Sequence, residues 1–286
     1  ASPGGRRQNP NRKALVQVAE ENYRLRNRWT VPKTQYWEWL ECERMFKGVA
    51  PKKGKASVSF SGWSTADALL HFGRQPGQLV CGLNFANGER VGGGYKTGAV
   101  AQEEDLCRRL PALYTTLIQA QKDKCYPFGP CTCASKDQPQ QYSDVLFTPN
   151  LVVARSGQDK DFTLLPASEQ ASCSLVTAAA PNVNFAQEVY DLDLMFNTVK
   201  ATFIAPLLAQ PDTTTLVLGA WGCGAFGGDP YQISELFAKA LLRDDMRSLY
   251  REVHFAIPTY SPDDVNAQVF RETLLRSGIQ LKEMGP

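Results

Sequence analysis

The segment from residue 79 to residue 104 reads LVCGLNFANGERVGGGYKTGAVAQEE, and it decides the fold that we expect for this chain. The apolar run Leu79–Phe85 is typical of a strand buried in a sheet. A loop with Gly92-Gly93-Gly94 follows, and Gln102-Glu103-Glu104 lies at the start of a predicted helix. In open α/β sheets ligands bind where such a strand ends, so the segment also predicts a binding site.

The rest of the chain repeats this alternation of apolar runs with helical patterns. Strands are expected at residues 57–61, 145–147, 151–153, 175–179, 216–219 and 253–257. Helices are expected at residues 12–28, from 65, from about 101, and at 185–209, 231–242 and 263–275. Pro111 should kink or divide the third of these helices, and residues 119–142 indicate a long loop. The alternation predicts an α/β layered sheet.

The composition is that of a globular protein, with 43% hydrophobic and 21% charged residues among 286. No stretch in residues 12–286 is typical of a linker, which favours a single domain that begins with a helical extension. Residues 1–11 are polar and rich in Gly, Pro and Arg, and we expect a disordered leader there. The net charge of +2 gives no reason to expect direct binding to nucleic acid.

Neither a membrane nor a metal is expected as a partner. No apolar run approaches the roughly 20 residues of a membrane helix. The eight cysteines are scattered, which favours reduced thiols and a cytoplasmic protein. Cys125, Cys131 and Cys133 lie close together but form no Cys-x-x-Cys pair, and the chain has only His71 and His254. We therefore expect no metal site and no cofactor.

A second glycine-rich loop, Gly222–Gly227, lies between a predicted strand and a helix that Asp229 and Pro230 should start. Its pattern Gly-x-Gly-x-x-Gly is also the dinucleotide fingerprint, which leaves a nicotinamide-dependent oxidoreductase as one alternative. Pro258-Thr259-Tyr260 stands where that fold needs an acidic residue, and too little chain follows for a full cofactor domain. Alone, Gln102-Glu103-Glu104 also has a plain explanation, because acidic residues at a helix start offset the macrodipole.

Together these segments resemble the bacterial-type poly(ADP-ribose) glycohydrolases, a family of divergent macrodomains. The resemblance rests on Leu83-Asn84-Phe85-Ala86-Asn87, on the three glycines, and on Ala101-Gln102-Glu103-Glu104, with seven residues between Gly94 and Gln102. It also rests on Ala180-Pro181-Asn182 and on LGAWGCGAFG at residues 218–227, and it runs from about residue 12 to 275. It implies a three-layer α/β/α macrodomain-like fold with a mixed central sheet.

The same resemblance implies roles for individual residues. Glu104 would be the catalytic acid and base, and Glu103 would bond ribose hydroxyls beside the scissile bond. Asn84 and Phe226 would contact the distal ribose, and Tyr260 is a candidate for adenine contact. The other substrate-binding residues, most of them in loops whose backbones would bracket the diphosphate, are Gly92, Gly93, Gly94, Gln102, Gly222, Cys223, Gly224, Ala225 and Gly227.

The implied reaction is hydrolysis of ribose–ribose O-glycosidic bonds in poly(ADP-ribose), with release of ADP-ribose. Poly(ADP-ribose) and ADP-ribosylated proteins would be the substrates of a monomer that reverses ADP-ribosylation in the DNA damage response. Two alternatives stay open: a non-catalytic ADP-ribose reader, which would not need Gln102-Glu103-Glu104, and a mono-ADP-ribosyl hydrolase with a similar pocket. The sequence does not distinguish cleavage at chain ends from internal cleavage.

Overall fold

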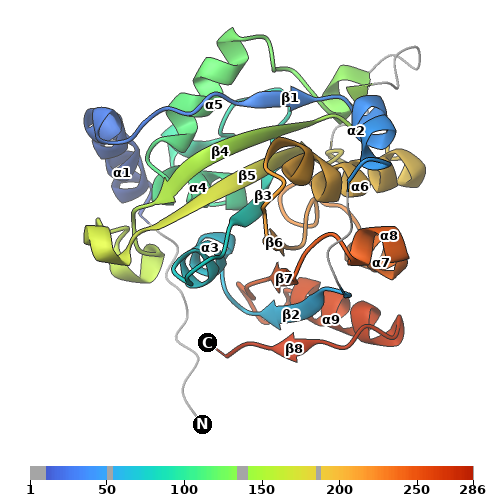
Figure 1. Cartoon of the computed structure of the whole chain (residues 1–286). Helices are drawn as coiled ribbons and strands as arrows, with labels where there is room; N and C mark the ends of the chain where they lie inside the picture. The colour runs from blue at the N-terminus through green and yellow to red at the C-terminus, as the bar shows by residue number, and fades with distance from the viewer. Residues whose placement is uncertain (1–10, 50–53, 134–140, 185–187, 286) are drawn as a thin grey trace.

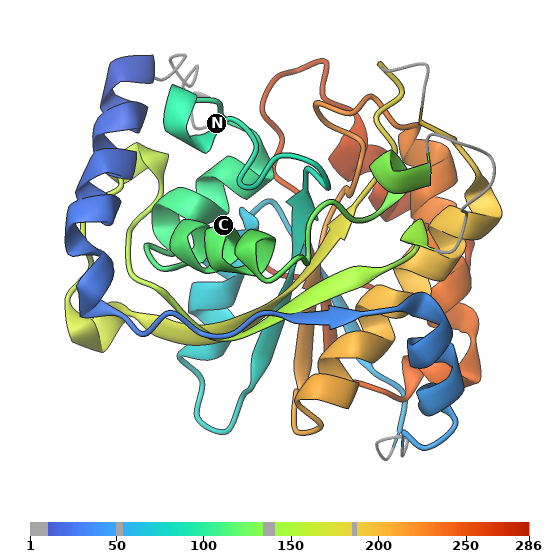
Figure 2. The same ribbon diagram turned by 90° about the horizontal axis from the view of Figure 1, so that it is seen from above.

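The computed structural model of the chain describes residues 11–49, 54–133, 141–184 and 188–285. These residues form a mixed sheet of eight strands with helices on both faces (Figure 1, Figure 2). In chain order, the strands are β1 (Gln35–Trp37), β2 (Ser57–Ser61), β3 (Val80–Ala86), β4 (Val145–Val153), β5 (Ala171–Ala179), β6 (Thr215–Leu218), β7 (Glu252–Ala256) and β8 (Lys282–Glu283).

Across the sheet, the strands follow the order β1-β4-β5-β3-β6-β7-β2-β8. Every neighbouring pair from β5 to β8 is parallel, whereas β4 is antiparallel to both β1 and β5. Because parallel strands end at the same edge of a sheet, the carboxyl ends of β3, β6 and β7 lie next to one another. A ligand site is expected at that edge.

The helices make the two outer layers of the expected three-layer fold. Figure 2 shows the N-terminal blue helix and the green helices on one side of the sheet, and the second blue helix together with the gold and orange helices on the other. The first layer consists of α1 (Arg12–Leu25), α3 (Thr65–Gly73), α4 (Gln102–Arg109) and α5 (Leu113–Lys122). The second layer consists of α2 (Trp39–Phe46), α6 (Leu192–Ala209), α7 (Pro230–Leu242), α8 (Asp244–Arg247) and α9 (Asn266–Arg276).

Each face of the sheet has its own hydrophobic core, and β3 contributes to both. Cys81 and Leu83 pack into the core beneath α6 and α7, whereas Val80 and Ala86 pack into the core beneath α3 and α4. This alternation follows from the two-residue period of a strand. Asn84 has the same parity as Val80 and Ala86, so its side chain is directed towards the α4 layer.

Most predicted elements are confirmed, and Pro111 separates α4 from α5 as expected. The two strands predicted at residues 145–147 and 151–153 are wrong as separate elements, because β4 runs through both. Its pairing with β5 shifts register between Thr148 and Leu151, where Asn150 has a φ of 53°. A short polar interruption of this kind looks like a turn in a sequence but is a bulge in a paired strand.

Other boundaries differ from the predicted ones. The sequence did not predict β1, α2 or β8, and the helix expected from residue 185 begins at Leu192. Part of the predicted loop is helical, because α5 extends to Lys122. Residues 1–10 of the predicted leader, residues 134–140 of the predicted loop and residues 185–187 of the predicted helix lie outside the described residues.

The helix α6 is long and apolar enough to cross a membrane by length and composition. In this fold, however, 61% of it is buried, and its side chains belong to the core that also contains α2 and α7. Its apolar character is therefore explained by its place between the sheet and other helices.

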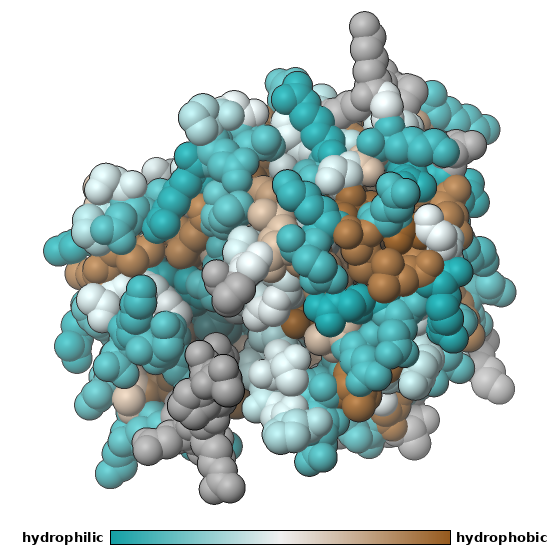
Figure 3. Space-filling model, turned by 90° about the horizontal axis from the view of Figure 1, so that it is seen from below, coloured by the Kyte–Doolittle hydropathy of each residue, from teal (hydrophilic) through white to brown (hydrophobic). Residues whose placement is uncertain are grey.

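The edge strand β8 is short and charged. It contains only Lys282 and Glu283, both exposed. Figure 3 shows the molecule from below, where hydrophilic side chains surround separate hydrophobic patches. Short, charged edge strands hinder pairing with a second sheet. The outer edge of the parallel half of the sheet therefore ends in a protected strand.

Candidate active site

A cavity of about 650 Å³ lies at the carboxyl ends of the parallel strands. This volume is within the range of roughly 300–1,000 Å³ that small-molecule sites occupy. Phe85 and Ala86 reach it from the end of β3, Ala220 from the end of β6, and Ala256 from the end of β7. The further lining residues come from the starts of α3, α4 and α9 and from four other segments between the named helices and strands: Ser64, Thr65, Ala99, Val100, Ala101, Gln102, Glu104, Asp105, Gln158, Ala180, Trp221, Gly222, Gly224, Ala225, Phe226, Ile257, Pro258, Tyr260, Asp264 and Asn266.

Glu104 lies on the wall of this cavity, in the first turn of α4. Its side chain is almost buried, and its Oε1 accepts a hydrogen bond of 2.7 Å from the backbone N–H of Gly94. A Cβ at Gly93 would lie 2.5 Å from the same oxygen, and Gly93 has a φ of 52°. Only glycine allows this loop to approach the carboxyl group so closely. The loop therefore fixes one oxygen of Glu104 and leaves the carboxyl group at the cavity wall.

Glu103 has a different environment and does not line the cavity. It is 2% exposed, and its carboxyl group accepts hydrogen bonds from the Asn87 backbone N–H at 3.1 Å and from Asn84 Nδ2 at 3.4 Å. Burial raises the pKa of Glu103 to about 8. The hydrogen bond from Asn87 lowers the pKa, and the nearby charge of Glu104 raises it further. Burial behind the wall thus favours the neutral form of Glu103. Its expected bond to ribose hydroxyls stays a prediction.

Two residues predicted to bind substrate, Asn84 and Gln102, use their side chains for hydrogen bonds within the protein near the end of β3. Asn84 is fully buried beneath Glu103, with Nδ2 also 3.4 Å from Thr177 Oγ1, and it is not on the cavity wall. Gln102 does reach the cavity, but its amide is used by β3. It accepts from the Phe85 N–H at 2.9 Å and donates to the Leu83 carbonyl at 2.8 Å. The pairing of β3 with β6 ends at Gly82. Beyond that point, the Gln102 side chain makes hydrogen bonds to the backbone of β3 that a neighbouring strand would otherwise make.

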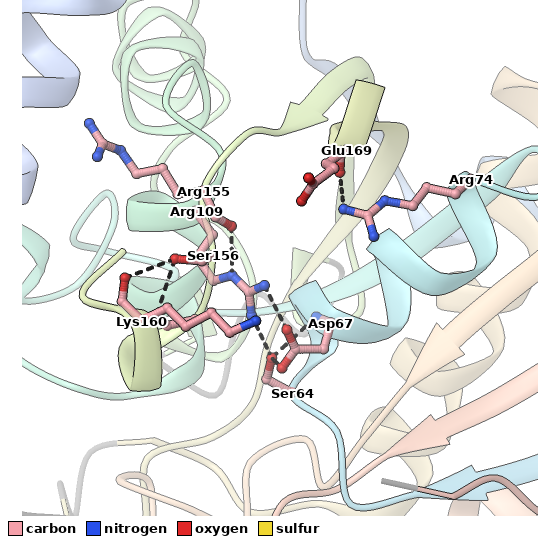
Figure 4. Close-up of polar contacts among 9 residues, drawn as sticks. Ser64, Asp67, Arg74, Arg109, Arg155, Ser156, Lys160 and Glu169 are labelled. Carbon is pink, nitrogen blue, oxygen red and sulfur yellow. Dashed lines mark hydrogen bonds and ion pairs between the residues drawn. The ribbon is translucent and has the colours of Figure 1, made fainter. Parts of the chain in front are cut away.

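Arg109, in the last turn of α4, attaches this helix to the start of α3 (Figure 4). Its Nη2 is 2.6 Å from Asp67 Oδ1, its Nη1 donates to Ser64 Oγ at 2.9 Å, and its Nε donates to the Arg155 carbonyl at 3.2 Å. Burial alone would raise the pKa of Asp67, but the charge and hydrogen bonds of Arg109 lower it. This ion pair, buried on the Arg109 side and half-exposed on the Asp67 side, connects the helix that carries Glu104 with α3.

The second glycine-rich loop forms the opposite wall. Gly222, Gly224, Ala225 and Phe226 all line the cavity. The backbone N–H groups of residues 224–226 donate to no acceptor among the described residues. None of the described lining residues is a lysine or an arginine, so an anion in this cavity would depend on backbone donors of this kind.

The remaining predicted residues lie behind these walls. Cys223 packs against the core, and its thiol donates to the Trp221 carbonyl at 3.6 Å. The glycines 92–94 and 227 are not on the cavity wall either, although Gly93 and Gly94 shape it through their contacts with Glu104. Neighbouring residues 183 and 184 bond to the carbonyls of Phe226 and Ala225, both at 3.0 Å, and so support the loop.

The sequence placed Tyr260 near the site correctly but missed several polar lining residues. Ser64, Gln158, Asp264 and Asn266 reach the cavity from three segments, since Asp264 and Asn266 both lie at the start of α9. For Ser64 a signal existed, because it follows the predicted strand at residues 57–61 and starts a helix. Gln158 lies in an irregular segment, and nothing in its neighbours indicated a site.

A three-layer fold with Glu104 on the wall of a cavity at the carboxyl ends of the parallel strands is typical of macrodomain-like proteins. Residues 9–156, more than half of the chain, match the family model described as microbial-type PARG, catalytic domain. The chain therefore belongs to the family of microbial-type poly(ADP-ribose) glycohydrolases. No curated protein sequence matches it.

Solved structures show the same fold. Poly(ADP-ribose) glycohydrolase from Thermomonospora curvata matches with a TM-score of 0.76 and 23% identity, over 92% of this chain and 100% of that one. The same enzyme bound to the inhibitor ADP-HPD matches with a TM-score of 0.74 and 23% identity, over 91% and 99%. The enzyme from Deinococcus radiodurans in complex with ADP-ribose matches with a TM-score of 0.71 and 24% identity, over 89% and 97%.

Proposed function

We propose that this chain hydrolyses the ribose–ribose O-glycosidic bond of poly(ADP-ribose) with Glu104 as general acid and then general base. One observation carries the assignment. Of the two adjacent glutamates, only Glu104 lies on the cavity wall, where the Gly94 N–H holds one of its oxygens at 2.7 Å. The second oxygen is the one that would exchange a proton with the substrate.

The reaction would begin with protonation of the leaving ribose oxygen by Glu104, while positive charge develops at the anomeric carbon. The resulting carboxylate would then take a proton from the water that attacks this carbon. Proton transfer by a positioned group typically contributes about 10²–10⁴ to a rate. Glu103 would remain neutral behind the wall, because burial raises its pKa to about 8. A neutral Glu103 avoids a second buried negative charge beside the catalytic group.

The second loop would hold the diphosphate. Three successive backbone N–H groups, at residues 224–226, have no acceptor among the described residues and lie at the cavity wall. Such groups bind phosphate oxygens without a lysine or an arginine. The bound diphosphate would also stabilise the positive charge that develops during cleavage, because charges interact strongly where water is excluded. No metal enters this mechanism.

The test is release of ADP-ribose from purified poly(ADP-ribose) by the wild type and by Glu104→Gln. The amide keeps the shape of the side chain but cannot supply the proton, so we expect turnover to fall by about 10²–10⁴ while ADP-ribose still binds. Glu272→Gln removes an exposed carboxyl group on α9 and serves as the matched control. Near-normal turnover by Glu104→Gln would exclude Glu104 as the acid.

The two alternatives correspond to other outcomes of this experiment. Tight binding of ADP-ribose without release from the polymer would indicate a non-catalytic reader. Release of ADP-ribose from a mono-ADP-ribosylated protein, but not from the polymer, would indicate a mono-ADP-ribosyl hydrolase. Monomeric state, a role in the DNA damage response and a cytoplasmic location are part of the proposal. The seven cysteines whose side chains the structure describes support the location, because all seven are free thiols.

A further inference from the structure

Asn22 lies in α1, outside the cavity, yet its side-chain amide contacts three other segments. It is only 2% exposed. Its Nδ2 donates to the Arg108 carbonyl at 2.9 Å, to the Cys107 carbonyl at 3.3 Å and to Tyr95 Oη at 3.1 Å. Its Oδ1 accepts from Arg155 Nε at 2.7 Å. One buried amide therefore uses both its donor and its acceptor groups.

Two of these segments carry the proposed catalytic machinery. Cys107 and Arg108 belong to the last turn of α4, whose first turn carries Glu104. The last carbonyls of a helix lack partners within the helix, so Asn22 supplies donors that this helix end needs. Tyr95 directly follows the three glycines, and its N–H donates to the Gly92 carbonyl at 3.0 Å. Asn22 thus connects the helix of Glu104 with the loop that fixes its carboxyl group.

The third segment carries Gln158 to the cavity wall. Arg155 precedes it, and its guanidinium donates through Nη1 to the Phe162 carbonyl at 2.8 Å. Phe162 and its neighbour Asp161 have φ values of 51° and 52°, which are uncommon for residues with a side chain. Figure 4 shows the guanidinium of Arg155 pointing away from Arg109, while the Arg155 carbonyl accepts from Arg109. Hydrogen bonds from Arg109 and from the Arg155 guanidinium therefore hold this segment in a backbone conformation that is energetically unfavourable.

We propose that Asn22 is a positioning residue of the active site, through which α1 sets the relative placement of Glu104 and Gln158. An alanine here would leave the buried Arg155 Nε and the two carbonyls without these partners, and such groups are expensive to leave unpaired. The surrounding segments would shift to find other partners. A shift of about 1 Å near the reacting groups can cost about 100-fold in rate. The inference rests on the proposed function for its catalytic part.

The experiment compares Asn22→Ala with Gln17→Ala, which removes an exposed amide from the same helix. The measurements are kcat on poly(ADP-ribose) per folded molecule, well below the melting temperature, and the Kd of ADP-ribose. For Asn22→Ala we expect kcat to fall by about 10- to 100-fold and Kd to rise several-fold. Gln17→Ala should match the wild type in both. A kcat and Kd within about twofold of wild type in folded Asn22→Ala would overturn the proposal.

Two further variants keep the test decisive if Asn22→Ala does not fold. Asn22→Asp retains an oxygen for Arg155 but loses the donors to α4, so kcat should fall more than ADP-ribose affinity. Tyr95→Phe removes only the hydroxyl that accepts from Asn22, and a smaller fall in kcat is expected. Wild-type kcat in both folded variants would also overturn the proposal. Should the wild type release no ADP-ribose, the proposed function fails, and the Kd comparison alone still decides the role of Asn22.

Discussion

Gly93 lies so close to Glu104 that a Cβ at this position would come within 2.5 Å of Oε1. Together with the hydrogen bond from Gly94, this contact leaves the carboxyl group little freedom to move on its loop side. The geometry explains why adjacent glycines stand ten residues before a glutamate in this chain. It also makes the placement of Glu104 testable without changing Glu104 itself.

Gly93→Ala should lower turnover by about 10- to 100-fold, because the new methyl group displaces the carboxyl group from its position. Gly77→Ala is the matched control. Gly77 also has a positive φ, 73°, but a Cβ there meets no described atom within 4 Å. Both variants should lose stability through backbone strain, measured by denaturant unfolding, but only Gly93→Ala should lose turnover per folded molecule. Equal kinetics for the two variants would show that the contact with Glu104 is unimportant.

Gly224→Ala should weaken ADP-ribose binding without destabilising the fold. A Cβ at Gly224 meets no described atom within 4 Å, so the empty cavity tolerates it, and we expect unfolding free energy to change by less than about 0.5 kcal/mol. The methyl group would, however, occupy space beside the proposed phosphate donors. Calorimetric titration should give a Kd raised at least about tenfold, which is about 1.4 kcal/mol. Gly285→Ala is the control, because a Cβ there also meets no described atom within 4 Å, and this variant should bind ADP-ribose with the wild-type Kd. An unchanged Kd for Gly224→Ala would show that the diphosphate does not bind beside residue 224.

Glu103 should make stability depend on pH. Burial raises its pKa to about 8 in the folded protein, above the ordinary value of 4.5. The folded state therefore binds this proton more tightly, so its contribution is complete below about pH 4.5 and is lost as the pH rises through 8. Between pH 6 and pH 9, the wild type should lose unfolding free energy relative to Glu103→Gln, whose amide stays neutral. Parallel stability curves for the two proteins would contradict the raised pKa.

Local sequence rules predicted the elements that local chemistry specifies. Ser64 caps α3 and Asp229 caps α7, each accepting a backbone N–H through its side chain, as such residues do at helix starts. Pro111 ends one helix because it cannot continue the hydrogen-bond pattern. These features depend on neighbours a few residues apart, so the sequence pattern alone was sufficient. The short elements β1 and β8 depend on pairing with distant strands, and the sequence gives no local signal for them.

The resemblance to the family brought the right segments together but could not give the direction of each side chain. Asn84 and Gln102 were expected to bind substrate. The structure shows Asn84 buried beneath Glu103 and Gln102 at the cavity wall and bonded to the backbone of β3, and their contacts with substrate stay predictions. A polar side chain at a strand end can bind substrate or stabilise the fold, and its hydrogen-bond partners decide which. Gln158 lies at the cavity wall in a segment that is bonded to Arg109 through the Arg155 carbonyl, a contact between residues 46 positions apart that no local pattern predicts.

The sequence by itself determined that two glycine-rich loops follow buried strands and that a pair of glutamates starts a helix after the first loop. Its local pattern could not decide which glutamate reaches the cavity, because adjacent residues on a helix point about 100° apart, and only the resemblance to the family singled out Glu104. The rotation of α4 is fixed by contacts distant in sequence, Asp67 with Arg109 and Asn22 with Arg108, which are 42 and 86 residues apart. Tertiary packing alone therefore placed Glu104 at the wall and buried Glu103 behind it.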